Sequence, residues 1–434
     1  MLQMKAVILV AGEGKRLLPI TSSTPKPMIP LLGKPLLEHV IISLKEAGID
    51  HFILIVGYKK EEVKNYFKKC ASKLKIKIEF ATQEEYLGTA HAASYAANFI
   101  ENEPFLMMYG DIFVDPNTYK EILKTIFEKK IENLMALVEV KNPNEYGIIT
   151  LDSFNHVEKI TEKPSPELNL GNLVNAGIFF FDSLIFKAIE KTNKSIRGEF
   201  EFTDSMEILI NDFDRQIEGF NMQDQYWNDV GLPWQLIEVN RFLLDRIKPT
   251  ILGNVEENVK VSGSVHIGKN TNILSGTYIK GPCYIGENCL IGPNAFIRPY
   301  TSIENNCHIG MSEVKNSLIF SDSSIPHFNY VGDSIICENV NLGAGTKISN
   351  LRFDNKTIKM NINNSLIDSG RRKLGAIIGP NCQTGINVSI MCGKKIGENS
   401  IIGAHTIVEE DILPSTIYYT GNDGKRIKKA NPFY

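Results

Sequence analysis

An aliphatic residue recurs every six positions through the C-terminal part of the chain, and this repeat limits the possible folds more than any other feature. The first series runs Val255, Val261, Ile267, Ile273, Ile279, Ile285, Ile291, Ile297, Ile303 and Ile309. A later series runs Ile378, Thr384, Ile390, Ile396, Ile402 and Val408, with the threonine as its one polar member. A short fixed period is typical of a solenoid. Six-residue steps predict a parallel β-helix in which each hexad forms one flat side of a triangular coil.

The residues beside each aliphatic position also follow the repeat. A glycine follows the isoleucine at 267, 285, 291 and 309, and we expect these glycines at the corners of the coil, where a positive φ is useful. The position two before each aliphatic residue is filled by Val259, Val265, Thr271, Thr277, Cys283, Cys289, Ala295, Thr301, Cys307 and Cys382. The four cysteines in that set are predicted to be core residues rather than metal ligands or nucleophiles.

The repeat is interrupted at Met311–Ser317 and again at Leu351–Ala376. Insertions in a solenoid project as loops, often from the binding face, so both interruptions are predicted to be loops. The tail Pro414–Tyr434 lies beyond the repeat, and its cations are Lys425, Arg426, Lys428 and Lys429. We expect this tail to be a solvated terminal strap, with contact to an acidic cofactor as the alternative.

Before residue 245 strand and helix signals alternate, which predicts a doubly wound α/β sheet with its ligands at the carboxyl ends of the strands. The expected strands are Lys5–Ala11, Phe52–Val56, Ile76–Phe80 and Phe105–Tyr109, and the expected helices are Leu36–Ala47, Glu61–Lys68 and Ala90–Phe99. The predicted organisation is an α/β domain over residues 1–245, a β-helix over 251–413 and a tail over 414–434.

Composition narrows the class of protein further. A chain of 434 residues exceeds one ordinary core, and its 47 basic and 50 acidic residues give no bulk attraction to nucleic acid or to an acidic membrane. No apolar run approaches the roughly 20 residues that span a bilayer, and the short run Ala6–Ala11 is predicted to be a strand rather than a signal peptide. Seven cysteines without a CxxC pair disfavour a zinc ribbon and a disulfide framework, which favours a cytoplasmic location.

Two cations accompany a glycine-rich turn after the first expected strand. The turn contains Gly12 and Gly14, Arg16 follows it, and Lys26 lies in a rigid Pro-Lys-Pro frame. Backbone amides of such a turn cradle phosphates, and the cations balance their charge. The segment therefore predicts a phosphate site.

This combination resembles the nucleoside-triphosphate:sugar-1-phosphate nucleotidylyltransferases, whose signature is Gly-x-Gly-x-Arg followed by Pro-Lys-Pro. The segments QEEYLGTAH from Gln83, YGD from Tyr109, EYG from Glu145, EKP from Glu162, NAG from Asn175 and WNDVG from Trp227 agree with the family in order. The resemblance implies that Arg16 and Lys26 are catalytic and that Asp111 and Asp229 bind Mg²⁺. The residues implied to bind the nucleotide are Ala11, Gly12, Gly14, Gln83, Gly88 and Thr89. The residues implied to bind the sugar phosphate are Tyr109, Gly147, Glu162, Lys163 and Asn175.

The reaction that this resemblance implies needs no covalent nucleophile from the protein. A sugar-1-phosphate oxygen attacks the α-phosphorus of the NTP and pyrophosphate leaves in line, so positioning and charge neutralisation lower the barrier. Gln83 and Gly88 would recognise a pyrimidine base. UTP and dTTP both stay open as substrates, because both present a pyrimidine edge.

Polar residues around the first interruption carry a second resemblance. His327, Tyr330 and Asn341 stand beside the hexads at ordered spacings. Together with the repeat they resemble the acetyltransferase half of the bifunctional enzymes that make UDP-N-acetylglucosamine, particularly their archaeal-type relatives. The fold that this family implies is a Rossmann-like nucleotidyltransferase domain followed by a left-handed parallel β-helix of hexapeptide repeats.

The second resemblance implies that His327 removes a proton from the amine of glucosamine-1-phosphate as the amine attacks acetyl-CoA, which suits a neutral imidazole. The residues implied to bind substrate are Arg298, Lys315, Tyr330, Asn341, Asn350 and Lys356. Acetyl-CoA would lie against the later coils between Gly379 and Ala404. A homotrimer is implied, since such grooves form between neighbouring solenoids.

Two departures limit the transfer from the family. The family's Asn-Tyr-Asp-Gly is replaced by Asn-Leu-Arg-Phe from Asn350, and Asp368–Leu374 is an addition expected near the cofactor side. The cations of that addition either meet the CoA phosphates or are solvated. Galactosamine-1-phosphate also stays open as the acetyl acceptor.

The leading hypothesis is a bifunctional transferase of UDP-N-acetylglucosamine biosynthesis, acting as both nucleotidyltransferase and acyltransferase. A monofunctional nucleotidylyltransferase with a β-helix for assembly or regulation is the first alternative, and the intact His327 argues against it. A non-catalytic, exchange-factor-like interaction subunit is the second. Retention of Lys26, Asp111 and Asp229 argues against that one.

Overall fold

The computed structural model describes residues 4–168, 170–223 and 225–433, with two compact units. The first unit comprises residues 1–13, 25–28 and 36–229, and the second comprises residues 14–24, 29–35 and 230–434. Among the described residues no helix has both the length and the apolar content that crossing a membrane requires.

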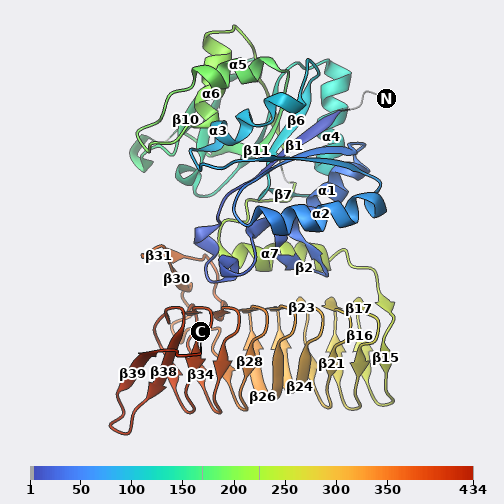
Figure 1. Ribbon diagram of the computed structural model, residues 1–434, viewed down its shortest axis with the longest axis vertical. Coiled ribbons are helices and arrows are strands. Elements are labelled where there is room, and N and C mark those ends of the chain that lie inside the picture. Colours follow the sequence, from blue (N-terminus) through green and yellow to red (C-terminus); the bar gives the residue numbers. More distant parts are fainter. Residues whose placement is uncertain (1–3, 169, 224, 434) are drawn as a thin grey trace. The chain divides into compact units, whose positions relative to one another are not determined.

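A nine-stranded mixed sheet forms the centre of the first unit (Figure 1). Its parallel strands are β1 (Lys5–Val10), β4 (His51–Val56), β5 (Lys77–Thr82) and β6 (Phe105–Tyr109). Its other strands are β8 (Leu134–Glu139), β9 (Gly147–Leu151), β10 (Val157–Glu162), β11 (Leu173–Phe181) and β12 (Glu218–Asn221). β11 runs antiparallel to β6, so the Rossmann-like parallel core is extended on one edge by a mixed arrangement, in which β11 and β8 pair antiparallel and β8 and β12 pair parallel.

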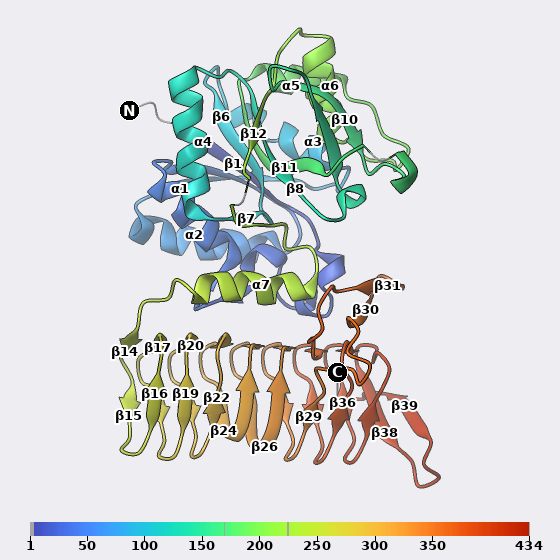
Figure 2. The same ribbon diagram turned by 180° about the vertical axis from the view of Figure 1, so that it is seen from behind.

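Helices cover both faces of this sheet, as its apolar strands require. The helices of the first unit are α1 (Leu36–Glu46), α2 (Lys60–Leu74), α3 (Thr89–Ser94), α4 (Pro116–Lys129), α5 (Leu184–Lys191) and α6 (Phe202–Asn211). α3, α5 and α6 pack together, and they share one apolar cluster with side chains of the sheet. α1 and α4 pack against each other (Figures 1 and 2). The helix expected over Ala90–Phe99 is divided, because α3 is followed by a separate 3₁₀ turn at Ala97–Phe99.

The second unit contains a left-handed parallel β-helix in which three hexads make one coil. Ile267 pairs with Ile285, and Ile285 pairs in turn with Ile303, so every third hexad returns to the same side. The first side consists of β14 (Thr250–Ile251), β17 (Val265–Ile267), β20 (Cys283–Ile285), β23 (Thr301–Ile303), β25 (Leu318–Ile319), β27 (Ile335–Ile336), β32 (Ile377–Ile378) and β35 (Lys395–Ile396). The predicted triangular coil is confirmed.

The other two sides join into one sheet. One of them consists of β15 (Asn254–Val255), β18 (Asn272–Ile273), β21 (Leu290–Ile291), β28 (Asn341–Leu342), β33 (Gln383–Thr384), β36 (Ile401–Ile402) and β38 (Thr416–Thr420). The other consists of β16 (Lys260–Ser262), β19 (Tyr278–Lys280), β22 (Phe296–Ile297), β29 (Lys347–Ile348), β34 (Ser389–Ile390) and β37 (Ile407–Val408). β24 (His308–Lys315) and β26 (Ser324–Gly332) belong to both sides, because each continues past the corner.

The hexad pattern predicted the β-helix core correctly. The repeating isoleucines from Ile267 onward are fully buried, and Thr384 is 6% exposed in the same row. Cys283, Cys289, Cys307 and Cys382 are buried in the core cluster as predicted. All seven cysteines lie among the described residues and are free.

The prediction of positive φ is confirmed for one of the glycines after the isoleucines, Gly292, which has φ +102°, and is wrong for others. Gly268 and Gly310 do not have positive φ; a β-carbon on Gly310 would lie 1.9 Å from the carbonyl oxygen of Pro326 in the next coil. These glycines are needed because adjacent coils approach closely. Asparagines supply the positive φ, and Asn270, Asn288 and Asn306 donate amide hydrogen bonds along the corner to the next coil.

The first interruption is not the projecting loop that we predicted. Val314 pairs with Val331 and Ile303 pairs with Ile319, and both steps fall short of the three full hexads between Ile267 and Ile285. β24 and β26 run through the corner as continuous strands, with a register shift between Met311 and Glu313. A straightened corner uses fewer residues than a turn, which explains the loss of the repeat.

The second interruption is an insertion. Ile336 pairs with Ile378, more than two regular coils further along the chain, and the extra residues include the hairpin β30 (Lys359–Ile362) and β31 (Ser365–Asp368). This hairpin projects from the coils (Figures 1 and 2).

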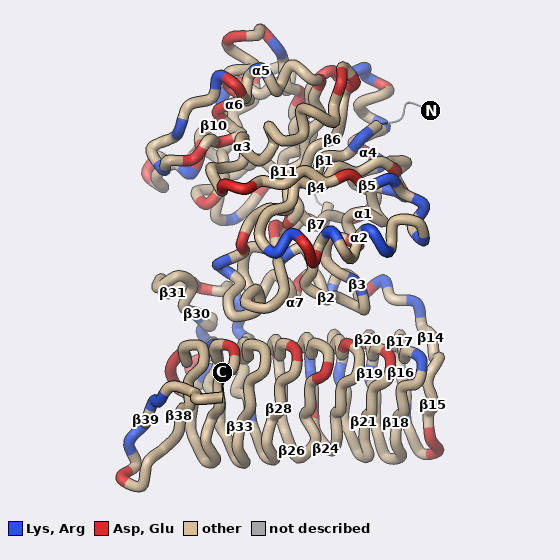
Figure 3. The backbone as a smooth tube through the Cα atoms, viewed as in Figure 1, with Lys and Arg blue, Asp and Glu red and all other residues tan. Residues whose placement is uncertain are grey.

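The tail forms a hairpin of β38 and β39 (Arg426–Ala430), and β38 continues the coil sheet through β36. Tyr418 is fully buried, so the tail is more firmly packed than the expected strap. Its cations lie on and beside β39, where Figure 3 shows blue segments.

The second unit also contains α7 (Pro233–Leu244) and the short hairpin β2 (Pro30–Leu31) and β3 (Lys34–Pro35). The turn of that hairpin packs on the coil. The N–H of Gly33 donates to the carboxylate of Glu304, at 3.1 Å and 3.2 Å from its two oxygens. Glu304 is buried, and α7 is tied to the same side because Asn240 hydrogen-bonds Ser302 at 2.6 Å.

Candidate active sites

Lys26 and Asp111 form an ion pair in the first unit. Lys26 begins the 3₁₀ turn Lys26–Met28, and its Nζ lies 2.6 Å from Oδ2 of Asp111, two residues beyond β6. The lysine side chain is 13% exposed and the aspartate side chain 32% exposed. The pair is therefore partly buried, with the carboxylate still reachable from solvent.

The second predicted metal-binding aspartate lies beside the first. β7 (Phe113–Val114) pairs antiparallel with β13 (Trp227–Asn228). Asp229 directly follows β13, and Asp111 lies two residues before β7. Continuing the antiparallel register places the two aspartates at neighbouring strand ends. Their oxygens are the hard donors that Mg²⁺ prefers, so the donor set fits this ion.

The predicted base-binding residues meet at the end of β5. Gln83 follows that strand and is 4% exposed; its Nε2 lies 3.2 Å from Nδ1 of His91 and 3.5 Å from the carbonyl oxygen of Gly88. Gly88 has φ +116°, and a β-carbon there would lie 2.5 Å from the carbonyl oxygen of Phe200. Thr89 begins α3 beside it. The glycine is required, and the glutamine is held in one orientation.

Glu162 and Gly147 lie opposite each other on β10 and β9. A β-carbon on Gly147 would lie 2.9 Å from Oε2 of Glu162, so the glycine makes room for the carboxylate. Nζ of Lys163 lies 3.9 Å from Oε1 of Glu162, and Nη2 of Arg197 lies 3.6 Å from it. Burial raises the pKa of Glu162 above its ordinary value, and the nearby lysine opposes that shift.

Tyr109 and Asn175 complete the predicted sugar-phosphate residues. Tyr109 ends β6, and burial raises the pKa of its phenol. Oδ1 of Asn175 accepts the N–H of Gly177 at 2.7 Å, where β11 changes register against β8. The side chain of Asn175 is therefore fixed by a local turn.

The glycine-rich turn is divided between the two units. Ala11 lies in the first unit, where its carbonyl oxygen accepts the N–H of Tyr58 at 3.0 Å, and Gly12 is exposed with open space around it. Gly14 and Arg16 lie in the second unit. Gly14 has φ +68°, and the guanidinium of Arg16 packs on Gly231, where a β-carbon would lie 2.7 Å from Nη2.

A buried carboxylate organises the predicted substrate residues of the β-helix. Asp333 accepts from Nζ of Lys315 at 3.0 Å, from Nδ2 of Asn316 at 2.6 Å and from Nδ2 of Asn350 at 2.5 Å. The same Nδ2 of Asn350 lies 3.2 Å from the hydroxyl of Tyr330. Four coil residues are thus joined through one charge, and burial raises the pKa of the Tyr330 phenol.

Arg298 joins this group at a cavity of about 770 Å³. Nη1 of Arg298 lies 2.6 Å from Oε1 of Glu313. The cavity is lined by Arg241, Arg298, Pro299, Tyr300, Lys315, Asn316, Asp333, Leu351, Arg371, Arg372 and Lys373. All of these residues belong to the second unit. The cations of the Asp368–Leu374 addition therefore line the same cavity as Arg298 and Lys315.

His327 lies apart from the cavity lining. It is exposed on β26, and its carbonyl oxygen accepts the N–H of Gly345 at 2.9 Å. His308 of β24 has its pKa lowered by burial and by the nearby His327. Asn341 is exposed on β28, which pairs with β26 at Ser324. These residues share one face of neighbouring coils.

The remaining predicted residues lie elsewhere in the second unit. Lys356 is exposed in the insertion, where its N–H donates to Asp354 at 3.2 Å. A β-carbon on Gly379 would lie 2.9 Å from Cβ of Pro19. Ala404 packs against Gly385 of the preceding coil. The structure does not gather these three residues around the cavity.

Sequence reasoning missed Asp333, Glu313, His308 and Arg241. Glu313 lies in the first interruption two residues before Lys315, and Asp333 lies three residues after Tyr330, so an acidic residue close to predicted substrate residues was the available signal. Arg241 lies on α7, far from Arg298 in the sequence, and no motif connects the two. Only the tertiary structure places it in the cavity.

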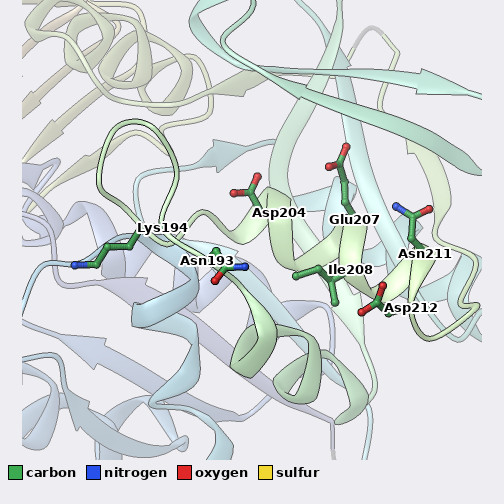
Figure 4. A pocket seen from close by; sticks show the side chains of 7 residues that line it. All are labelled: Asn193, Lys194, Asp204, Glu207, Ile208, Asn211 and Asp212. Carbon is green, nitrogen blue, oxygen red and sulfur yellow. The ribbon is translucent and has the colours of Figure 1, made fainter.

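A second hollow lies along α6 in the first unit (Figure 4). It measures about 290 Å³ and is lined by Asn193, Lys194, Asp204, Glu207, Ile208, Asn211 and Asp212. None of the predicted site residues lines it. Burial raises the pKa of Asp204, and the nearby Glu201 adds to that shift.

Comparison with known families matches both parts of the chain. The family described as Nucleotidyl transferase matches residues 5–246, and the GMPPB C-terminal domain matches residues 279–370. The first match covers more than half of the chain.

Curated relatives match over almost the whole length. The "Bifunctional protein GlmU" of Methanocaldococcus jannaschii is 45% identical over 417 residues, which are 96% of this chain and 97% of that protein. The "Bifunctional sugar-1-phosphate nucleotidylyltransferase/acetyltransferase" of Sulfurisphaera tokodaii is 46% identical over 411 residues, which are 94% of this chain and 98% of that one.

Among solved structures, a UDP-glucose pyrophosphorylase complexed with UDP-glucose is similar in fold. The TM-score is 0.51 and the sequence identity 23%, with 56% of this chain and 99% of that chain covered. At this identity the likeness supports the fold of the first unit alone.

Proposed function

The chain belongs to the family of bifunctional sugar-1-phosphate nucleotidylyltransferases/acetyltransferases, and from that premise we propose which substrates and residues carry its two reactions. It is an enzyme with both transferase activities. The acetyltransferase acts on glucosamine-1-phosphate or galactosamine-1-phosphate with acetyl-CoA. The nucleotidylyltransferase then transfers UMP or dTMP from UTP or dTTP to the N-acetylated sugar phosphate or to glucose-1-phosphate, and releases pyrophosphate.

The ion pair of Lys26 with Asp111, beside Asp229, is the observation that carries the nucleotidylyl assignment. Asp111 and Asp229 would hold Mg²⁺, which supplies neutralisation of phosphate charge when bound. Lys26 stabilises a phosphate oxygen of the nucleotide, and Arg16 serves the same role from the glycine-rich turn. Lys163 binds the sugar phosphate, which then attacks in line.

His327 is the proposed base of acetyl transfer. As the C–N bond forms between the amine and the thioester carbon, the imidazole accepts the amine proton; the C–S bond then breaks, and the proton passes to the leaving thiolate of CoA. Tyr330, Asn341, Asn350 and Lys356 orient the acceptor. Acetyl-CoA lies along the coils that contain Gly379 and Ala404.

A homotrimer supplies the groove for this reaction, and a cytoplasmic location fits the free cysteines. His327 and Asn341 lie on one exposed face of the coils, while Arg298 and Lys315 line a cavity. A neighbouring solenoid that closes this face would complete the site.

Product analysis tests the proposal. Each NTP is offered with each sugar-1-phosphate and amino-sugar-1-phosphate, with and without acetyl-CoA, in the presence of Mg²⁺. We expect N-acetylation that needs acetyl-CoA, and pyrophosphate release that needs UTP or dTTP. If neither N-acetylated product nor pyrophosphate forms with any of these substrates, the assignment of substrates is refuted.

An Asp111→Asn variant tests the metal site. It should lower pyrophosphate release about 100-fold or more while acetyl transfer continues. Asp212→Asn, at the hollow along α6, is the matched control and should leave both rates unchanged. Nucleotide-sugar formation by Asp111→Asn at the parent rate would show that the metal assignment is wrong.

A further inference from the structure

The cavity of the second unit carries a large excess of positive charge. Its lining contains six cations, which are Arg241, Arg298, Lys315, Arg371, Arg372 and Lys373, and one carboxylate, Asp333. Like charges gathered around one cavity repel unless an anion lies among them. A cavity of about 770 Å³ is in the range of small-molecule sites.

The cations that the family resemblance assigned to phosphate are already neutralised within the chain. Arg298 is paired with Glu313 at 2.6 Å, and Lys315 with Asp333 at 3.0 Å. Because each of these two cations is paired with a carboxylate, together they contribute little net attraction for an anion in the cavity. The excess charge must come from the other lining residues.

Three of those other cations have no carboxylate within ion-pair distance among the residues that the structure describes. They are Arg241, Arg372 and Lys373. Arg241 stacks on Tyr300, with its guanidinium carbon 4.1 Å from the ring centre, and Arg372 donates to Oδ1 of Asn355 at 2.8 Å. Stacking on an aromatic ring leaves the N–H edge of a guanidinium available to a ligand.

The cavity walls are also fixed relative to each other. Arg371, from the insertion, forms an ion pair of 3.2 Å with Glu238 of α7, and Arg241 lies further along that helix. The opposite wall is the coil, where Asn240 hydrogen-bonds Ser302 and the carbonyl oxygen of Tyr300. The cations of the helix and of the insertion therefore face the coil in a preformed site.

We propose that Arg241 and Arg372, which the family resemblance does not include, bind the phosphate of the acetyl acceptor in this cavity. The inference rests on the proposed acetyl transfer to an amino-sugar-1-phosphate. Guanidinium groups bind phosphate oxygens through paired, charge-assisted hydrogen bonds. A phosphate monoester dianion is the ligand chemistry, and the two sources of it here are the sugar-1-phosphate and the 3′-phosphate of CoA.

Position favours the sugar-1-phosphate. Lys315 and Asp333 line the same cavity, and Asp333 is joined through Asn350 to Tyr330 on the strand that also carries His327. A phosphate in the cavity thus lies on the acceptor side of the proposed base. On this proposal the 368–374 addition acts in acceptor binding rather than in contact with CoA.

Steady-state kinetics of Arg241→Gln and Arg372→Gln in the full chain test this. We expect the KM for glucosamine-1-phosphate to rise at least 10-fold and the KM for acetyl-CoA to change less than 2-fold. Arg246→Gln, just beyond the end of the same helix and outside the cavity lining, is the matched control and should change neither. A larger effect on acetyl-CoA, or an unchanged KM for the acceptor, would overturn the proposal.

An acceptor without phosphate separates charge from structure. With glucosamine, the ratio of variant to parent kcat/KM should be close to one, because the contact that was removed is absent for both enzymes. Arg241→Lys should recover part of the lost acceptor affinity. An equal loss with glucosamine would assign a purely structural role to these arginines and refute phosphate binding.

Calorimetric binding of glucosamine-1-phosphate distinguishes this inference from the proposed function. If the parent binds the sugar phosphate and Arg241→Gln binds it at least 10-fold more weakly, the cavity assignment holds even where no acetyl group is transferred. If the parent acetylates the acceptor and the variants bind it as tightly as the parent does, the cavity assignment fails while the function stands.

Discussion

The hydroxyl of Tyr146 donates a hydrogen bond to Oδ2 of Asp229 over 3.0 Å. Tyr146 precedes β9 in the segment EYG, which also contains the predicted sugar-phosphate residue Gly147. The contact orients one of the two carboxylates proposed for Mg²⁺. A group that orients a metal ligand contributes to metal affinity without touching the metal.

A Tyr146→Phe variant should therefore need more Mg²⁺. We expect the Mg²⁺ concentration for half-maximal pyrophosphate release to rise about 10-fold, with a smaller change in the rate at saturating Mg²⁺. Titration of the initial rate with Mg²⁺ measures this. Tyr278→Phe, on a coil of the β-helix, should titrate like the parent, and an unchanged midpoint for Tyr146→Phe would separate this tyrosine from the metal site.

Replacing His327 by Gln should remove acetyl transfer selectively. The amide cannot accept the amine proton as an imidazole does, so we expect kcat for N-acetylation to fall about 100-fold or more. Pyrophosphate release should remain at the parent rate. Thiol release from acetyl-CoA is the measurement, and His266→Gln, in an early coil, serves as control. Full acetyl transfer by His327→Gln would eliminate it as the base.

Removing the Asp333 carboxylate should destabilise the second unit. Asp333→Ala leaves the buried amide of Asn316 and the ammonium of Lys315 without this acceptor and removes one of the two acceptors of Asn350, which costs about 3 kcal/mol. We expect the calorimetric unfolding temperature to fall by about 5 °C or more. Asp322→Ala, at an exposed corner, should shift it much less. Equal stability of parent and Asp333→Ala would contradict the organising role of this carboxylate.

Glu304 should make the second unit less stable as the pH rises. Burial raises the pKa of its carboxyl to about 7, although the N–H groups of Gly33 and Leu32 oppose that shift. The folded state then holds this proton more tightly than the unfolded chain, whose glutamate titrates near 4.3. The stabilisation is complete below about pH 4 and is lost as the pH rises to about 7, by about 3 kcal/mol in total.

A Glu304→Gln variant should lack this loss. The difference in unfolding temperature, variant minus parent, should be larger at pH 8 than at pH 5. The reason is that only the parent must bury a charged carboxylate at pH 8. Calorimetry at the two pH values, with Glu287→Gln as an exposed control, measures the difference. The same difference at both pH values would show that Glu304 does not titrate between them.

The hexad period was sufficient to predict the β-helix and its core, because an inward position tolerates only apolar or small side chains. Ile285 and Cys283 are buried where the period placed them. The period could not distinguish a glycine at a turn from a glycine between coils. Gly310 is required by the backbone of Pro326, a contact between residues of different coils.

The candidate sites were predictable to the extent that they lie in continuous motifs. Lys26 and Asp111 are close in the structure because the strands that precede them, β1 and β6, are neighbours in one sheet. Gln83 and Gly88 are close because both lie in the short loop that follows β5. Arg241 was not predictable, because its approach to Arg298 depends on how α7 packs along the coil. The first interruption was also misjudged, since a shortened coil and an inserted loop both break a period.

The hairpin of β30 and β31 enters between coils that remain in register. Ile348 pairs with Ile390 across the insertion just as Ile267 pairs with Ile285 elsewhere. In a solenoid each coil contacts only its neighbours, so the stability of the array is close to a sum of local interfaces. Substitutions at the tip of the hairpin should therefore not change the stability of coils two turns away. Under the proposed acceptor site, substitutions in the insertion would change acceptor binding while the folding of the scaffold stays the same.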